Sequence, residues 1–142
     1  MKQLFATLLR LAQVQGQALD RLALQASLEN VASAASKPQA LVAALLHSLQ
    51  LPKAQWRAGK AVDPSHAPGL LVNAQGDWGL LRGRNGQDLW VSEWFEEQEN
   101  KWTEKTTPDL ADFEFAKLRL AKPFEASNSP VFRLIRDEVF QN

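Results

Sequence analysis

The 142-residue chain has no cysteine and no tyrosine, and it has only two histidines. Without cysteine it can form neither a disulfide framework nor a thiolate zinc site, and it holds no cysteine nucleophile. The two histidines, His47 and His66, are too few for a histidine-based metal cluster. We therefore expect no metal site in this chain and no chemistry that depends on a thiol.

The chain also lacks an excess of charge of either sign, because sixteen Lys and Arg residues balance sixteen Asp and Glu residues. A nucleic-acid-binding domain is normally basic, so we expect no nucleic-acid partner. No apolar run reaches the roughly 18 to 20 residues of a membrane span, and the N-terminus lacks the features of a signal peptide. The composition predicts one soluble domain of a reducing compartment.

The charges are distributed unevenly along the chain. Residues 1–60 carry seven basic and two acidic residues, whereas residues 61–142 carry nine basic and fourteen acidic residues. Eight of the acidic residues lie in the segment from Glu93 to Glu114, which contains only two lysines. Such a run is typical of a solvated face, and mutual repulsion predicts that the segment is mobile. The alternative is an acidic patch that binds a basic partner surface.

The first half of the chain has helical periodicity. Apolar residues at the i, i+4, i+7 spacing predict an amphipathic helix over residues 2–15, which Gly16 ends. A second helix is expected within residues 20–30. A third is expected after Ser36 as its N-cap, with Pro38 in its first turn, and Leu51-Pro52 ends it.

The second half has the pattern of an antiparallel meander. Strands are predicted at residues 69–73, 78–82 and 88–92. The Asn-Gly pair at 85–86 is the strongest hairpin signal, because both residue types tolerate a positive φ. A further apolar strand is expected over residues 113–120.

The remaining segments are less regular. The polar residues 93–110 favour a helix plus a loop, residues 125–130 resemble a linker, and residues 131–140 favour a new amphipathic helix. Helices that precede strands predict an α+β fold in which N-terminal helices pack on an antiparallel sheet.

Most catalytic motifs are missing: the sequence has no G-x-S-x-G, no G-x-x-x-x-G-K-[ST] and no H-E-x-x-H. His47 and Ser48 are neighbours on a predicted helix and point about 100° apart, so they cannot form a base–nucleophile pair. We expect His47 to be partly buried and structural. His66, with Asp63 or Ser65 as a partner, would suit proton transfer or a weak metal site, although the flanking prolines more simply indicate a rigid loop.

Tryptophan is unusually frequent, with five residues, four of which fall between Trp78 and Trp102. Core packing is one explanation, since each ring buries about 150–250 Å². The alternative is an exposed aromatic groove that holds an extended peptide, because aromatic residues are enriched at interface hot spots.

The order and spacing of these segments resemble a known family. A stretch of the form P-G-L-L-V-x(4)-D-W-G-L-L at residues 68–81 follows the short helices and precedes a glycine-bearing hairpin and an apolar strand at 116–120. This layout resembles the papain-like cysteine peptidase domain at the N-terminus of bacteriocin-exporting ABC transporters. It is more similar to the degenerate, peptidase-like version in type I secretion exporters such as the haemolysin transporter. The resemblance covers roughly residues 1–122.

The family's three catalytic positions are all substituted. Its cysteine falls on Gln3 or close to it, and its histidine falls on Asp77 within Gly76-Asp77-Trp78. Its aspartate, which begins an Asp-Pro pair, falls near Ser92-Glu93, where no such pair occurs. Even the degenerate exporters often keep the histidine. Without thiolate or imidazole there is neither nucleophile nor base, so we expect no catalytic residue.

The resemblance implies a peptidase-like domain over residues 1–124, followed at 125–142 by a linker and the start of a helix that leads to a transmembrane region. The domain would lie at the cytoplasmic face of the bacterial inner membrane. It would recruit or hold an unfolded secreted polypeptide, or contact the nucleotide-binding domain of the same transporter. It would have no cofactor of its own, and ATP would belong to the parent transporter. The residues expected to bind the substrate are Asp77, Trp78, Trp90 and Trp94.

Two alternatives from other classes remain open. One is a free-standing hydrolase or transferase that uses His66 with Asp63 or Asp77. The other is a stand-alone protein-interaction adaptor.

Overall fold

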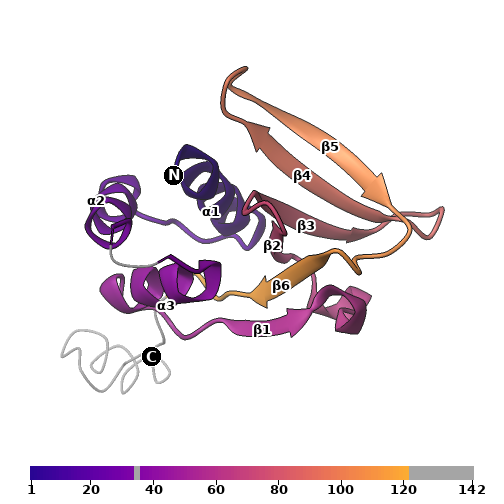
Figure 1. Ribbon diagram of the computed structural model, residues 1–142, viewed down its shortest axis with the longest axis horizontal. Helices are drawn as coiled ribbons and strands as arrows, with labels where there is room; N and C mark the ends of the chain where they lie inside the picture. The colour runs from indigo at the N-terminus through magenta and orange to yellow at the C-terminus, as the bar shows by residue number, and fades with distance from the viewer. Residues whose placement is uncertain (34–35, 122–142) are drawn as a thin grey trace, which may run out of the picture.

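The computed structural model describes residues 1–33 and 36–121, which form three helices and a six-stranded antiparallel sheet (Figure 1). The α+β class is therefore confirmed. The expected linker at 125–130 and the expected helix at 131–140 lie outside the described residues.

The three helices occupy the positions that the periodicity predicts. Asp20 caps the second helix, because its carboxylate accepts hydrogen bonds from the backbone N–H groups of Leu22 and Ala23. The expected cap at Ser36 is wrong: Lys37 holds the N-cap position and its side chain makes no capping hydrogen bond. The described helices are α1 (Lys2–Val14), α2 (Arg21–Val31) and α3 (Pro38–Ser48).

The sheet has the order β1-β6-β2-β3-β4-β5, so the last strand in the sequence is inserted between the first two. Every neighbouring pair is antiparallel. The sequence pattern did not predict β1, and β6 is shorter than the expected strand over 113–120. The strands are β1 (Gln55–Ala58), β2 (Gly69–Asn73), β3 (Trp78–Arg84), β4 (Trp90–Glu96), β5 (Lys101–Thr107) and β6 (Phe113–Lys117).

The prediction of a helix plus a loop over residues 93–110 is wrong. Strand β4 continues to Glu96, and β5 pairs with it along its full length, from Trp90 opposite Thr107 to Glu96 opposite Lys101. An aromatic pair stabilises this hairpin, since the rings of Phe95 and Trp102 lie 5.4 Å apart on adjacent strands. The acidic run therefore belongs to an ordered hairpin whose outer strand, β5, forms one edge of the sheet.

The turn between β3 and β4 also differs from the expectation. The positive φ lies at Asp88 (63°), and neither Asn85 nor Gly86 has one. Asn85 acts through its side chain instead, because its Oδ1 accepts hydrogen bonds from the backbone N–H groups of Gln87 and Leu89.

Two hydrophobic clusters lie on opposite faces of the sheet. Because side chains alternate along a strand, Leu70 packs with the helices whereas Leu71 packs in the second cluster. The helical face joins the leucines of all three helices to β2, β3 and β6. The other cluster contains Val62, Leu71, Leu81, Trp90, Trp94, Leu110 and Phe115.

Gly79 provides a test of this packing. A Cβ atom at Gly79 would lie 2.7 Å from the ring of Trp94, which is 4% exposed and held in the second cluster. We expect Gly79→Ala to lower the free energy of unfolding by about 1–3 kcal/mol, as overpacking does. The control is Gly86→Ala, where the Cβ meets nothing within 4 Å and φ is not positive. Equal stabilities of the two variants in urea denaturation would contradict the packing described.

Candidate functional site

The first turn of α1 is fixed to the sheet by Gln3. Its Oε1 accepts a hydrogen bond from the backbone N–H of Trp78 at 2.7 Å, and its Nε2 donates to the carbonyl oxygen of Phe95 at 3.2 Å. Its own backbone N–H donates to Glu97 Oε2 at 2.9 Å, where a carboxylate also favours the positive end of the helix dipole. Gln3 therefore joins α1 to both β3 and β4.

The corner before β3 is held by a compact turn. Asn73 Oδ1 accepts from the backbone N–H groups of Gln75 and Asp77, and Asn73 Nδ2 donates to Asp77 Oδ2 at 3.3 Å. Gly76 has a φ of 86°, a conformation that favours glycine. The turn places Asp77 at the surface, immediately before the backbone N–H that Gln3 binds.

Gln3 and Asp77 line the same pocket, which we call the Gln3 cleft. Its volume is about 350 Å³, within the range of about 300–1,000 Å³ for small-ligand sites. Four of its lining residues are acidic, and Glu99 is paired with Lys101 at 2.7 Å. The cleft can accept hydrogen bonds and attract a cation, and its lining residues include neither a cysteine nor a histidine. Its lining residues are Gln3, Asp77, Phe95, Glu96, Glu97, Gln98 and Glu99.

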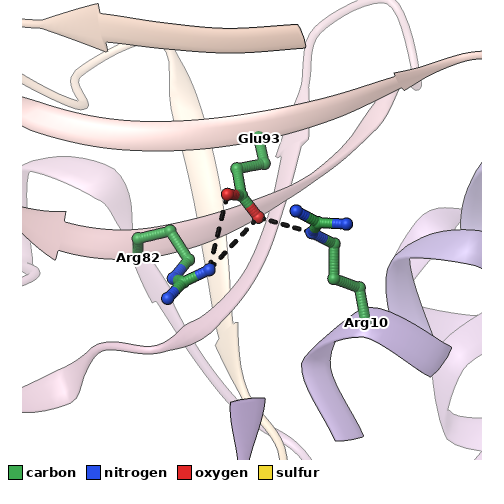
Figure 2. A network of polar contacts seen from close by, with 3 residues as sticks. All are labelled: Arg10, Arg82 and Glu93. Carbon is green, nitrogen blue, oxygen red and sulfur yellow. Dashed lines mark hydrogen bonds and ion pairs between the residues drawn. The ribbon is translucent and has the colours of Figure 1, made fainter. Parts of the chain in front are cut away.

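Glu93, near which the resemblance would place the family's third catalytic residue, is part of an ion-pair network (Figure 2). Glu93 accepts from Arg10 Nε at 2.7 Å and lies 3.4 Å from Arg82 Nη1. The Glu93 side chain is only 13% exposed. Its carboxylate is therefore shared between two arginines, one from α1 and one from β3, and is not available to orient a catalytic base.

The three tryptophans expected to bind substrate are buried. Trp78 is 7% exposed and packs with the helices, whereas Trp90 and Trp94 are 5% and 4% exposed and belong to the cluster on the opposite face. Trp94 Nε1 donates to Ser92 Oγ at 2.8 Å, which satisfies its polar atom internally. The structure therefore does not gather these rings into one exposed groove, and Asp77 is the one exposed member of the set.

His66 belongs to a local cap. Its Nδ1 accepts from the backbone N–H of Asp63 at 3.0 Å, and its Nε2 lies 3.7 Å from Asp63 Oδ2. The hydroxyl of Ser65 donates to Asp63 and holds the pKa of that carboxyl below its usual value. The contacts of His66 with Asp63 therefore cap a short 3₁₀ turn, Pro64–His66.

His47 is exposed, so the expectation that it is partly buried is wrong. Its neighbour Ser48 instead makes a hydrogen bond of 2.9 Å with Ser27 that links α3 to α2. Within residues 1–33 and 36–121, no three His, Cys, Asp or Glu side chains come together in a group that could hold a metal ion.

The comparisons with known proteins identify no relative: no family model, no curated protein and no solved structure matches this chain. None of the helices in the described part of the chain has the length and hydropathy needed to cross a membrane.

Phe95, Glu97 and Arg10 were not predicted as site residues. Their roles depend on pairings between α1 and β4, such as Arg10 with Glu93, which are 83 residues apart in sequence. The only local signal was the acidic run that contains Glu97, for which the sequence predicted a helix plus a loop.

Trp78 distinguishes a core role from a recognition role. Because its ring is buried among the helices, we expect Trp78→Ala to cost about 3–5 kcal/mol of the free energy of unfolding. Trp102→Ala is the control, since that ring is only half-buried on the edge strand, and its loss should be clearly smaller. Thermal and urea unfolding measure both variants. An unchanged melting temperature for Trp78→Ala would contradict the core role.

Proposed function

We propose that this chain is a catalytically inactive, papain-like peptidase-like domain of a type I secretion ABC exporter. Its function would be to recruit or hold the unfolded polypeptide that the exporter secretes, at the cytoplasmic face of the bacterial inner membrane. The domain would bind no cofactor, and the ATP that drives export would be bound by the parent transporter.

The observation that carries this proposal is the contact between Gln3 and the Asp77–Trp78 corner. The resemblance assigns the family's cysteine to Gln3 or close to it and the family's histidine to Asp77. Although 75 residues separate Gln3 from Trp78, Gln3 Oε1 lies 2.7 Å from the backbone nitrogen of Trp78. Gln3 and Asp77 also line one cleft. A papain-like site requires that a residue at the start of a helix lie next to a residue at the start of a strand.

The same residues support an inactive domain. An amide and a carboxylate stand where the chemistry requires a thiolate and an imidazole, and neither can perform nucleophilic attack with proton transfer in that arrangement. Gln3 is also fully engaged in hydrogen bonds to β3 and β4. The substitution thus replaces catalytic contacts with structural ones.

The alternative of a hydrolase centred on His66 receives less support. Its Nδ1 is used as the acceptor of the Asp63 backbone N–H, and its Nε2 lies 3.7 Å from the carboxylate of the same residue, so His66 contacts the turn that it caps. Asp77, the other proposed partner, interacts with Asn73 and lines the Gln3 cleft, whose residues do not include His66.

Introducing a cysteine and a histidine tests whether the Gln3 cleft corresponds to the family's catalytic site. We expect the unmodified chain to leave a double-glycine leader peptide uncleaved. In the variant Gln3→Cys with Asp77→His, the imidazole should lower the pKa of the new thiol and speed its alkylation by iodoacetamide at neutral pH by at least about threefold. The control is Gln3→Cys alone, because Glu97 and the helix terminus act equally on both thiols. Equal alkylation rates would contradict the proposed correspondence of positions.

The coding sequence provides a second, independent test. If the chain belongs to an exporter, the codons that follow Asn142 should encode apolar spans of about 20 residues and later a phosphate-binding loop. Sequencing the complete gene and its transcript checks this. A stop codon directly after Asn142 would overturn the assignment to an exporter.

A further inference from the structure

A second pocket lies between the outer side of α1 and the β4–β5 hairpin, and we call it the cationic groove. Its volume is about 360 Å³, and it shares Phe95 with the Gln3 cleft. Its described lining residues include three cations and three aromatic rings and no acidic residue. These six residues are Lys2, Arg10, Arg21, Phe5, Phe95 and Trp102.

The cations of this groove are arranged over the rings. The guanidinium carbon of Arg10 lies 4.5 Å from the centre of the Trp102 ring, and that of Arg21 lies 5.5 Å from the centre of the Phe5 ring. A guanidinium group that stacks on a ring can still donate hydrogen bonds from its edge to a carboxylate. Arg10 is already paired with Glu93, whereas neither Lys2 nor Arg21 forms an ion pair within the described part of the chain.

We propose that the cationic groove binds an extended acidic segment of a polypeptide. Carboxylates of the segment would pair with Lys2 and Arg21, and a neighbouring aromatic or aliphatic side chain would pack against Phe5 and Trp102. This inference rests on the proposed function only in the nature of the partner, which is an unfolded polypeptide. It adds a location and a charge preference that the proposed function does not specify.

The surroundings of the groove favour a polypeptide over a nucleic acid. Directly beyond Phe95 lies the Gln3 cleft, with Glu96, Glu97 and Glu99 among its lining residues. A nucleic acid carries a phosphate at every nucleotide, so a strand that extended beyond the groove would be repelled there. A polypeptide can place acidic residues in the groove and neutral or basic residues over the cleft.

The double variant Lys2→Glu with Arg21→Glu tests the proposal. Both residues are exposed and stand in the first turn of a helix, where an acidic side chain is favourable, so the fold should be retained. The matched control is Lys60→Glu, an exposed charge reversal in the short turn that follows β1, outside the groove. The probe is a fluorescein-labelled unstructured peptide that contains aspartate and phenylalanine. Its lysine-for-aspartate counterpart and a single-stranded thymidine oligonucleotide serve as comparisons.

We expect the unmodified chain and Lys60→Glu to bind the acidic peptide with equal affinity, which added salt weakens. The double variant should bind it at least about tenfold more weakly and should gain affinity for the lysine peptide. Fluorescence anisotropy measures the affinity of each protein variant for each labelled probe. Three results would overturn the inference. The first is that the unmodified chain fails to bind the acidic peptide, and the second is that the double variant binds that peptide as tightly as the unmodified chain does. The third result is that the unmodified chain binds the oligonucleotide more tightly than it binds the acidic peptide. None of these outcomes affects the test by the codons after Asn142, so the two proposals fail separately.

Discussion

The position of α1 on the sheet is the constraint on which the other features depend. A glutamine at each end of the helix bonds to backbone groups outside it: Gln3 bonds to β3 and β4, and Gln15 bonds to the chain after β6. Each side-chain amide uses both its oxygen and its nitrogen. The net gain is about 0.5–1.5 kcal/mol per bond, and leaving such backbone groups unpaired would cost about 1–3 kcal/mol. Leu4, Leu8 and Leu11 lie between these ends in the core, so the helix cannot slide without losing contacts at both ends.

This fixed helix defines both pockets at once. The Gln3 cleft lies at the start of α1, and the cationic groove follows its outer side, so one element lines both. Glu93 stabilises the same region, because it joins Arg10 on α1 to Arg82 on β3. A papain-like enzyme needs its helix start held rigidly so that nucleophile and base meet. The function proposed above would use the same rigidity for binding alone.

The sequence predicts what depends on neighbours along the chain and misses what depends on distant partners. Helical spacing located all three helices, and short apolar runs bounded by turn residues located β2, β3 and the start of β4. Strand β5 was missed because its charges indicate a solvated loop, whereas its stability comes from Phe95 and Trp102 on paired strands. Gln3 could be placed near the Asp77 corner only through a resemblance, since no local pattern joins residues 75 positions apart. The sequence could not predict whether the tryptophans are buried, because burial also depends on residues that are distant along the chain.

The two pockets beside α1 carry opposite charges: acidic residues line the Gln3 cleft, and basic residues line the cationic groove. Carboxylates surround Phe95 on the side of the Gln3 cleft, and cations surround it on the side of the groove. An extended chain that crossed Phe95 would therefore be favoured in one orientation, with its acidic part over Arg21 and its basic part over Glu97. If the groove binds an acidic segment as proposed, such a surface would select among unfolded polypeptides by their charge pattern.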